Sequence, residues 1–377
     1  MLVALMVPGF WVAVYRFLFG LQAVTNLDQE HPWGLWIAID VATGVALAAG
    51  GFTTAALAHI FYRRQYEIIT RPALLTALLG YTFVALGLLA DLGRYYNIWH
   101  PMLPSMWQGD SVLFEVGMCV MAYLTVLYIE FAPAVCERFV GDPRFPTLSR
   151  FCAALLGWLR PTMFLFILAG VVLSCLHQSS LGTLMVIAPS KVHPLWYTPV
   201  LPLLFLLSAI AVGFPMVIVE SLSASWAGRL EPEIGVLSGL ARLTPVLLGV
   251  YLAVKIGDLV IRESYVHLTD VSAASVFFAI EIVGGVLVPM VLMSSARVRR
   301  SRVGLFVSAL LVVVGVALNR VNVFLVAYQP PYATRNYFPS WGEFAVTLAL
   351  IAGLILVYRV LVTLLPVIGQ PSRVTAS

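Results

Sequence analysis

The sequence predicts an all-α integral membrane protein with about ten transmembrane helices and no soluble domain. Of its 377 residues, 61% are hydrophobic and only 11% are charged, whereas soluble domains are about 25% charged. Apolar side chains at this density exceed what a water-soluble core can bury, so the lipid bilayer must surround most of the chain. We therefore expect one polytopic membrane domain over 1–377. The formal net charge of +4 gives no reason to expect a nucleic-acid partner.

Ten apolar stretches are long enough to cross a bilayer, which takes about 20 residues. The segment 147–158 is a candidate for a stretch that lies along the membrane interface, because Arg160-Pro161 marks the start of the fifth span. The expected spans are 2–21, 35–60, 72–97, 111–136, 159–177, 200–223, 240–261, 271–295, 303–327 and 343–365.

Arginine and lysine are unequally divided between alternate loops. The loops after the odd-numbered spans hold only Lys191, Arg262 and Arg335. The loops after spans two, four, six and eight hold eleven basic residues: Arg63, Arg64, Arg71, Arg138, Arg144, Arg150, Arg229, Arg297, Arg299, Arg300 and Arg302. The positive-inside rule then puts both termini in the cytoplasm. The regular alternation also supports the number of spans.

The loops on the opposite, outer side are long and rich in aromatic residues and histidine. Tryptophan and tyrosine favour membrane interfaces, so one interpretation of these loops is anchoring. The other is a rigid surface that receives a partner protein, which the prolines and histidines favour. The residues expected to form that docking surface are Trp33, Trp36, His193, Trp196 and Trp341.

A weak internal repeat suggests two halves. Asp91-Leu92 recurs as Asp258-Leu259, and Ser111-Val112-Leu113-Phe114 resembles Ser275-Val276-Phe277-Phe278. Pairing the spans in this way preserves their direction through the membrane. We expect two four-helix bundles, 30–180 (helices 2–5) and 198–328 (helices 6–9), with one flanking helix at each end.

Five ionisable residues fall at a similar depth towards the outer side of consecutive spans. Ionisable groups are costly in a bilayer and face the protein interior or a wet cavity. Asp91 and Arg94, three residues apart, can share one helix face. Because acids outnumber the arginine, one carboxyl would be free to exchange protons. The alternative is an ion-pair network that only holds helices together. The five residues are Asp40, Asp91, Arg94, Glu115 and His177.

Three further acids could line a proton path from the cytoplasm. Glu281 is near the middle of the eighth span, and Glu130 and Glu220 are near the inner ends of theirs. For the latter two, simple solvation at the interface is the alternative. Lys255 and Asp258 are expected to pair with each other, being three residues apart.

The sequence argues against a resident metal or haem. None of the four cysteines has the tight spacing of an iron–sulfur or zinc site. A membrane haem needs histidines on facing helices at matched depth. His59 and His177 are at helix ends on opposite sides, and the other four histidines are in outer loops. We therefore expect no haem, iron–sulfur cluster or metal in this chain.

Several short motifs follow one another along the chain. The first set is Pro32-Trp33-Gly34-x-Trp36-Ile37-Ala38-x-Asp40, Arg71-Pro72-Ala73-Leu74-Leu75 and Asp91-x-Gly93-Arg94-Tyr95. Taken in order, these motifs resemble the NrfD/PsrC-like superfamily of quinone-reactive membrane subunits. A second set is Ser111-Val112-Leu113-Phe114-Glu115, Glu130-Phe131-Ala132-Pro133, His177-Gln178-Ser179-Ser180-x-Gly182, Lys191-Val192-His193-Pro194-Leu195-Trp196 and Tyr337-Phe338-Pro339-x-Trp341. This set is similar to the ten-helix membrane subunits of periplasmic nickel–iron hydrogenases of the hydrogenase-2 type, and the likeness runs from about 15 to 366.

The resemblance implies a role in a bacterial cytoplasmic membrane. Members of the family bind a periplasmic ferredoxin-like iron–sulfur subunit, which exchanges electrons with the large and small subunits of a nickel–iron hydrogenase. Quinone, here expected to be menaquinone, reacts near the outer surface, and the resemblance leaves open whether proton transfer is coupled. The five outer residues would form the quinone site, while hydrogen activation would take place in another subunit, so no catalytic residue is expected here.

Three alternatives remain at this point. Electrons could come from a multihaem cytochrome or a molybdopterin enzyme instead of a hydrogenase. A secondary transporter would also suit two bundles with membrane acids, although Gly213 and Pro215 are the only notable interruption of a span. A purely structural anchor would not need the cluster of acids and arginine.

Overall fold

The computed structural model describes residues 1–228, 234–270 and 272–367, which leaves Arg229 outside the described part. Those residues are almost entirely helical, and they hold no β-strand beyond a single bridge between Val192 and Tyr328. Within the described residues, ten helical spans are long and apolar enough to cross a membrane. The predicted fold class, a multi-pass all-α membrane protein, is confirmed.

Most spans are single helices, and three are built from shorter pieces. The single helices of the first half are α1 (Leu2–Phe19), α4 (Glu67–Asp91), α5 (Val112–Phe139) and α6 (Pro146–Val186). Those of the second half are α7 (Leu201–Gly228), α8 (Ile234–Ile261) and α13 (Trp341–Leu364), and α1 and α13 flank the rest. The second span, Trp36–Ile60, joins a π-helix (Trp36–Thr43), α2 (Gly44–Leu47), α3 (Ala49–Ala55) and a π-helical end (Ala56–Ile60). The eighth joins α9 (Ala273–Ile282), a π-helix (Val283–Leu287) and α10 (Val288–Ser294), and α11 (Ala296–Arg300) follows. The ninth joins α12 (Arg302–Val321) and a π-helix (Asn322–Val326).

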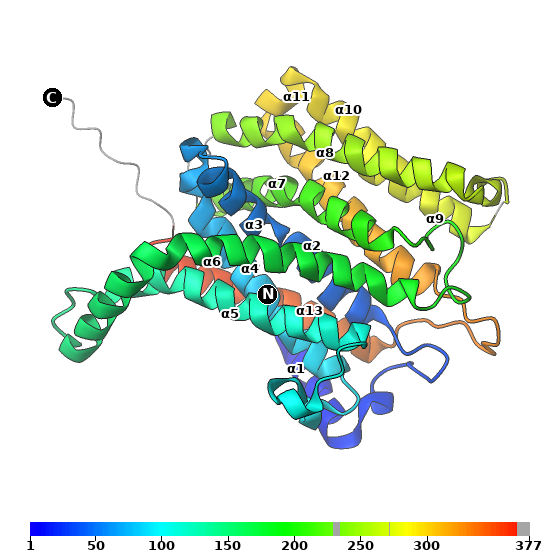
Figure 1. Ribbon diagram of the computed structural model, residues 1–377, viewed down its shortest axis with the longest axis horizontal. Helices are drawn as coiled ribbons and strands as arrows, with labels where there is room; N and C mark the ends of the chain where they lie inside the picture. Colours follow the sequence, from blue (N-terminus) through cyan, green and yellow to red (C-terminus); the bar gives the residue numbers. More distant parts are fainter. Residues whose placement is uncertain (229–233, 271, 368–377) are drawn as a thin grey trace.

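Two predicted spans differ most from the observed helices. The third was expected to reach residue 97, but α4 ends at Asp91, and Leu92 turns to an extended conformation. The fifth was expected to start near 159, but α6 runs unbroken for 41 residues through Arg160-Pro161, a length of about 60 Å. An internal proline bends a helix without having to end it. Figure 1 shows the first part of α6 turned away from the direction of the other helices.

The loops divide between two faces of the molecule. Basic residues gather where α5 meets α6 and around α11; we call this side the arginine-rich face. The opposite, arginine-poor face carries the loops 20–35, 92–111, 187–200, 262–270 and 327–340, four of which lie towards the right of Figure 1. Which face meets the cytoplasm stays a prediction from the positive-inside rule.

Neighbouring spans pack in the order that two groups of four would require. Contacts join α3 to α4, α4 to α5 and α5 to α6, and separately α7 to α8, α8 to α10 and α10 to α12. The groups meet where α7 contacts α3 and α6, and α1 packs on α13. The division into two bundles at 30–180 and 198–328 itself stays a prediction.

The second span is central because small residues let its neighbours approach closely. A Cβ atom at Gly213 of α7 would lie 2.4 Å from the Thr53 hydroxyl oxygen, and one at Gly51 would lie 2.4 Å from Ala77 of α4. The π-helix at its start widens the backbone, and such widening is frequent at functional sites. Asp40 lies in the middle of this π-helix, so the widened turn positions its carboxyl group.

Candidate functional site

A cavity lies between the second span, α4 and α13, and Met216 of α7 also lines it. Its empty volume is about 900 Å³, counting the space at its open mouth. The walls are apolar apart from Asp40, Thr43 and Thr76. Ile351 and Ile355, which are exposed on the surface of the helices, form part of the rim. An apolar molecule could therefore enter this cavity from the lipid.

Among the described residues, Asp40 supplies the only carboxyl group of the cavity wall. The side chain is buried, and the Thr347 hydroxyl of α13 donates a hydrogen bond of 2.7 Å to its Oδ2. Gly87 of α4 faces it so closely that an added Cβ would lie 2.9 Å from the Asp40 Cβ. The position of the carboxyl group is therefore fixed by three helices.

Asp91 lies near the part of the cavity that Asp40 lines. Beside it is Arg16, an arginine that was not among the predicted site residues. The Arg16 side chain of α1 is fully buried. Its Nε donates to the Ala90 carbonyl oxygen at 2.6 Å, and a terminal nitrogen donates to the Leu92 carbonyl oxygen. Arg16 thus binds carbonyl groups at the end of α4, where a cation is favourable. Arg16, Glu343 and Asp40 all lie close enough to Asp91 for their side chains to interact with it electrostatically.

The five predicted quinone-site residues do not form one cluster. Asp40 and Asp91 lie close enough for their charges to interact. Arg94 is exposed in the loop beyond α4, so it shares no helix face with Asp91, and Glu115 is exposed in the first turn of α5. His177 is nine residues before the end of α6, where its Nδ1 lies 3.0 Å from the Tyr81 hydroxyl oxygen. The expectation of matched depth failed because α4 is shorter and α6 longer than predicted.

Glu343, in the first turn of α13, connects the first loop, the last loop and the second span on the arginine-poor face. It accepts hydrogen bonds from the backbone N–H groups of Asn26 and Ser340 and from the Tyr337 hydroxyl. Burial, together with the nearby Glu343, raises the pKa of Tyr337 well above its usual range. The Trp36 indole N–H donates to the Glu343 carbonyl oxygen at 3.1 Å. The capping box Ser340-x-x-Glu343 is a sequence signal that could have marked this residue.

The expected docking residues divide by exposure. Trp36 and Trp196 are 1% and 0% exposed, so neither can touch a partner on the surface. Both indole N–H groups instead bond inside the protein, which is how a buried tryptophan is normally satisfied. Trp33 and His193 are partly buried, and Trp341 is 72% exposed. Burial lowers the pKa of His193, and the neighbouring His267 lowers it further.

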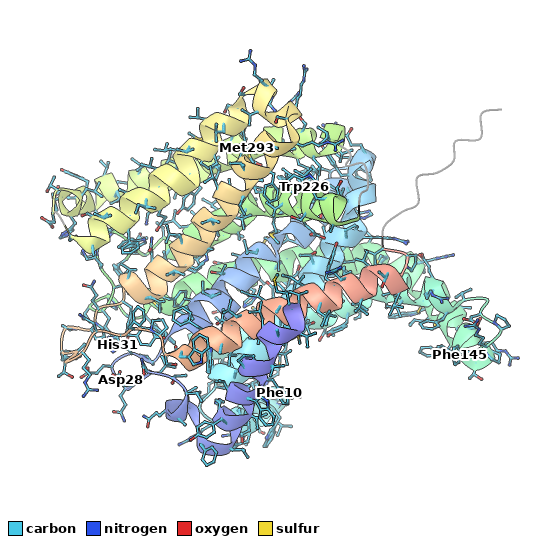
Figure 2. All side chains as sticks on the ribbon, turned by 180° about the vertical axis from the view of Figure 1, so that it is seen from behind. Phe10, Asp28, His31, Phe145, Trp226 and Met293 are labelled. Carbon is cyan, nitrogen blue, oxygen red and sulfur yellow. The ribbon has the colours of Figure 1, made fainter. Side chains whose placement is uncertain are left out.

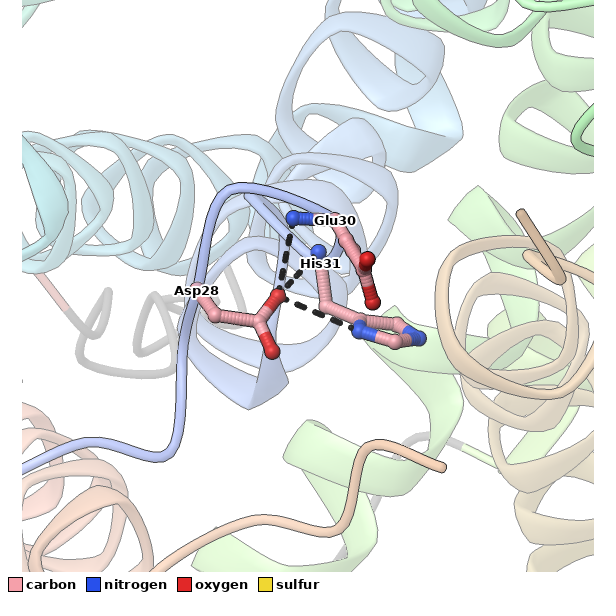
Figure 3. A group of neighbouring side chains, drawn as sticks. All are labelled: Asp28, Glu30 and His31. Atoms are coloured by element: carbon pink, nitrogen blue, oxygen red, sulfur yellow. Dashed lines mark hydrogen bonds and ion pairs between the residues drawn. The ribbon is translucent and has the colours of Figure 1, made fainter. Parts of the chain in front are cut away.

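Asp28, Glu30 and His31 form a compact group in the first loop of this face (Figure 3). Asp28 accepts hydrogen bonds from the backbone N–H groups of Glu30 and His31, and these bonds lower the pKa of its carboxyl group. Glu30 in turn accepts from the Thr334 N–H at 3.1 Å. These contacts form a turn that ties two loops together, and they account for the group without a metal ion.

A second polar centre lies in the other half of the molecule. Glu281 is buried and accepts three hydrogen bonds, from Trp196 Nε1 at 2.9 Å and from the Asn319 and Asn322 side chains at 2.7 Å each. Arg320 donates to Ser208 and packs over the Phe205 ring at 3.7 Å. The sequence predicted Glu281 but not the residues around it, although the polar ones interrupt apolar stretches.

The expected pairing of Lys255 with Asp258 is not observed. Lys255 donates to the Leu195 carbonyl oxygen at 3.1 Å. Asp258 instead binds Arg262, at 2.8 Å, and the Thr198 hydroxyl, at 2.6 Å. Arg262 is one turn further along α8 than Asp258 and brings a forked donor that suits a carboxylate.

The three acids proposed for a proton path lie in three separate places. Glu130 borders a small cavity between α5, α6 and α3, and Glu281 borders another between α7, α8, α9 and α12. Glu220 of α7 accepts a hydrogen bond of 2.6 Å from the Tyr358 hydroxyl of α13. Thr76, a wall residue of the Asp40 cavity, neighbours both Glu220 and Tyr358. Of these three acids, Glu220 is therefore the one that adjoins the Asp40 cavity.

The six histidines, all of which the structure describes, do not provide a site for a haem held by two imidazoles. His177 is the only one buried within the helices, and Tyr81 occupies its Nδ1 side. His59 is at the far end of the second span, and His31, His100, His193 and His267 are in loops. No two of these histidines face each other from adjacent spans, so no step is assigned to a haem, and its absence stays a prediction.

The fold of the described residues, with its ten spans, buried acids and aromatic loops, is that of a multi-pass integral membrane protein. Residues 23–332 match the family described as polysulphide reductase, NrfD. The chain belongs to this family. The matched region includes Asp40 and Asp91 but ends before α13, which supplies Thr347 and one wall of the cavity.

Similar chains cover nearly the whole length. A protein of Nitratidesulfovibrio vulgaris strain Hildenborough, whose name states no function, is 38% identical over 97% of this chain and 93% of its own length. The probable Ni/Fe-hydrogenase 2 b-type cytochrome subunit of Escherichia coli K12 is 37% identical over 94% and 88%. The menaquinone reductase integral membrane subunit of N. vulgaris is 26% identical over 96% and 89%.

Proposed function

We propose that this chain is the quinone-reactive membrane subunit of a respiratory nickel–iron hydrogenase complex, and that quinone reacts in the Asp40 cavity. The observation that carries the proposal is the shape and lining of this cavity. It is apolar, it opens between lipid-facing side chains, and it ends at a buried carboxyl group. A quinone needs an apolar slot for its ring and tail and a polar group for its oxygen atoms.

Two protons and two electrons convert a quinone to a quinol. In the proposal, electrons arrive at the arginine-poor face from an iron–sulfur subunit. Asp40 holds a proton within reach of a quinone oxygen, and Thr347 keeps the carboxyl group in place. Asp91 and Arg16 set the charge near that end of the cavity. General acid–base transfer of this kind requires the carboxyl group to be held at hydrogen-bond distance.

Protons are proposed to reach the cavity from its other end. Glu220 and Tyr358 lie beside Thr76, which is eleven residues, or about 16 Å, along α4 from Gly87, the residue that faces Asp40. Buried carboxyl groups in membrane helices are typical members of proton relays. Glu130 and Glu281 were proposed for the same path, but each borders a cavity of its own, so we assign the relay to Glu220.

The hydrogenase partner is proposed from the relatives. One relative is named as a hydrogenase 2 subunit and another as a menaquinone reductase subunit. A ferredoxin-like iron–sulfur subunit would dock on the arginine-poor face, where Trp341 is exposed and Trp33 and His193 are partly exposed. The second candidate is the same quinone site served by a different electron-transfer partner. A relative from Mesobacillus selenatarsenatis, named as a selenate reductase subunit and 23% identical over 96% of this chain, favours that candidate.

The test uses membranes with and without the gene for this chain, and with the variant Asp40→Asn. Hydrogen-dependent reduction of a soluble dye and of a menaquinone analogue is measured side by side. We expect dye reduction to persist while quinone reduction disappears without the chain and falls at least tenfold in Asp40→Asn. The control is Asp142→Asn, a substitution in the loop between α5 and α6 on the arginine-rich face, and it should leave both activities unchanged. Loss of neither activity on deletion would reject the hydrogenase partner, and full quinone activity in Asp40→Asn would reject the cavity.

A further inference from the structure

The end of the α5–α6 hairpin extends away from the other helices. Figure 2 shows Phe145 at its tip, apart from the rest of the molecule, and Figure 1 shows the same extension from the other side. At 41 residues, α6 is about twice as long as a bilayer crossing requires. Its first part must therefore leave the hydrocarbon region on the arginine-rich face.

The surface of this extension is both aromatic and basic. Phe145, Phe151 and Trp158 are more than half exposed. The exposed arginines of the same region are Arg138, Arg144, Arg150 and Arg160. Exposed aromatic rings interleaved with arginine are typical of helices that lie in a lipid headgroup region. Water on all sides would leave these rings without an apolar environment.

The positive charge of the tip is not balanced within the protein. Glu137 forms an ion pair of 2.9 Å with Arg71. Asp142 lies 3.9 Å from Arg138 and accepts the backbone N–H of Arg144 at 2.9 Å. In the part of the chain that the structure describes, the guanidinium groups of Arg144, Arg150 and Arg160 have no ion pair. An anionic partner would complement them.

A groove between α5 and α6 leads to this basic tip. Its empty volume is about 640 Å³, and its walls include Ile129 and Ala132 of α5 and Leu155, Trp158 and Leu159 of α6. The two hydroxyl groups along it already have partners. Thr125 donates to the Met121 carbonyl oxygen at 2.8 Å, and the Tyr128 hydroxyl lies 3.1 Å from that of Thr82. The groove therefore suits an apolar guest.

The groove and the arginines are in the correct order for one molecule to occupy both. Along α5, Ala132 precedes Arg138 by six residues, and along α6, Arg150 precedes Leu155 by five. Both separations correspond to about 7–9 Å along a helix, towards the arginine-rich face. A phospholipid whose acyl chain lies in the groove would bring its phosphate to the level of these arginines.

We propose that the α5–α6 hairpin binds an anionic phospholipid, with one acyl chain in the groove and the headgroup at Arg138, Arg144 and Arg150. The site holds the bent part of α6 in the headgroup region of the leaflet on the arginine-rich face. It is separate from the Asp40 cavity and does not depend on the proposed function.

The test uses the full chain in lipid nanodiscs with a trace of phosphatidylglycerol that carries a photoreactive diazirine on its acyl chain. After illumination, we expect the label on peptides containing residues 125–132 and 155–159. Unlabelled phosphatidylglycerol should compete, and phosphatidylcholine should compete about 25-fold less well. The factor corresponds to roughly fivefold for each of two arginines near a lipid surface.

Two variants and one control distinguish the parts of the site. Arg144→Ala with Arg150→Ala should remove the preference for phosphatidylglycerol while leaving the chain folded. Ala132→Trp fills the groove and should abolish the labelling of both peptides. The matched control is Arg297→Ala with Arg300→Ala, two exposed arginines of α11 on the same face that do not belong to the α5–α6 hairpin. It should label as the unaltered chain does.

Three results would overturn the proposal: equal competition by phosphatidylcholine, labelling spread evenly over the lipid-facing helices, or an equal effect of the two double-arginine variants. Exclusion of the tip from lipid, seen as no labelling of either peptide, would instead place the hairpin in water as a surface for a protein partner and would equally refute the lipid site.

Discussion

The substitution Gly87→Ala tests whether the position of Asp40 governs quinone turnover. A Cβ at residue 87 would lie 2.9 Å from the Asp40 Cβ, whereas ordinary contacts begin at 3.4 Å. The carboxyl group must therefore shift by about 0.5 Å, with its hydrogen bond to Thr347 displaced. Because misplacement of a reacting group by about 1 Å can cost a factor of about 100, a shift of half that size corresponds to roughly tenfold, or about 1.4 kcal/mol in the barrier.

The assay is hydrogen-dependent reduction of a menaquinone analogue, divided by dye reduction in the same membranes. We expect kcat/KM for the quinone to fall about tenfold in Gly87→Ala while dye reduction is unchanged. Gly117→Ala is the matched control, because a Cβ there on α5 would meet nothing within 4 Å. Equal quinone kinetics in the two variants would refute the argument that Asp40 acts through its exact placement at this cavity.

Three further predictions concern stability, measured as the thermal unfolding midpoint of the detergent-solubilised chain. Glu281→Gln replaces a carboxylate that accepts three hydrogen bonds. The free energy of unfolding should therefore fall by about 3 kcal/mol, whereas the exposed Glu115→Gln should change it by less than about 0.5 kcal/mol. Arg16→Gln removes two hydrogen bonds from a buried guanidinium to the end of α4, again a loss of about 3 kcal/mol; an equally small effect of Arg16→Gln and the exposed Arg94→Gln would contradict this. Burial lowers the pKa of His193 in the folded state, so the unfolded chain binds a proton at this residue more tightly. The stability that neutral His193 provides is therefore present above about pH 6.5 and is lost as the pH falls. His193→Gln should flatten this pH dependence between about pH 7.5 and 5, and an unaltered slope would show that other groups cause it.

Hydropathy and the alternation of arginine between loops were sufficient to predict the number of spans, because both follow from the cost of placing polar groups in lipid. Helix ends were predicted less well. A proline at 161 was interpreted as a boundary, although α6 continues through it. The end of α4 at Asp91 depends on Arg16, which binds carbonyl oxygens from a helix distant in sequence. Local propensity contains no information on that contact.

The polar residues of the site were predicted in part. Asp40 and Asp91 were identified because carboxyl groups are rare in spans. The same rule extends to Arg16 and Arg320, both fully buried, but it was applied to the acids and to Arg94 instead. Thr347 could not have been found in this way, because a hydroxyl group in a helix is usually satisfied by its own backbone. Its role comes from facing Asp40 across 307 residues of sequence.

The long separation of Asp40 from Thr347 in the sequence determines when the cavity is completed during synthesis. The first loop is fastened to the last one by bonds from Asn26 to Phe338 and from Ser340 to Val24, and α13 provides one wall of the cavity. During synthesis, the spans before α13 can enter the membrane while the cavity still lacks this wall. The binding site is therefore completed only with the final helix. A chain that terminates before α13 would insert into the membrane but would lack one wall of the quinone cavity.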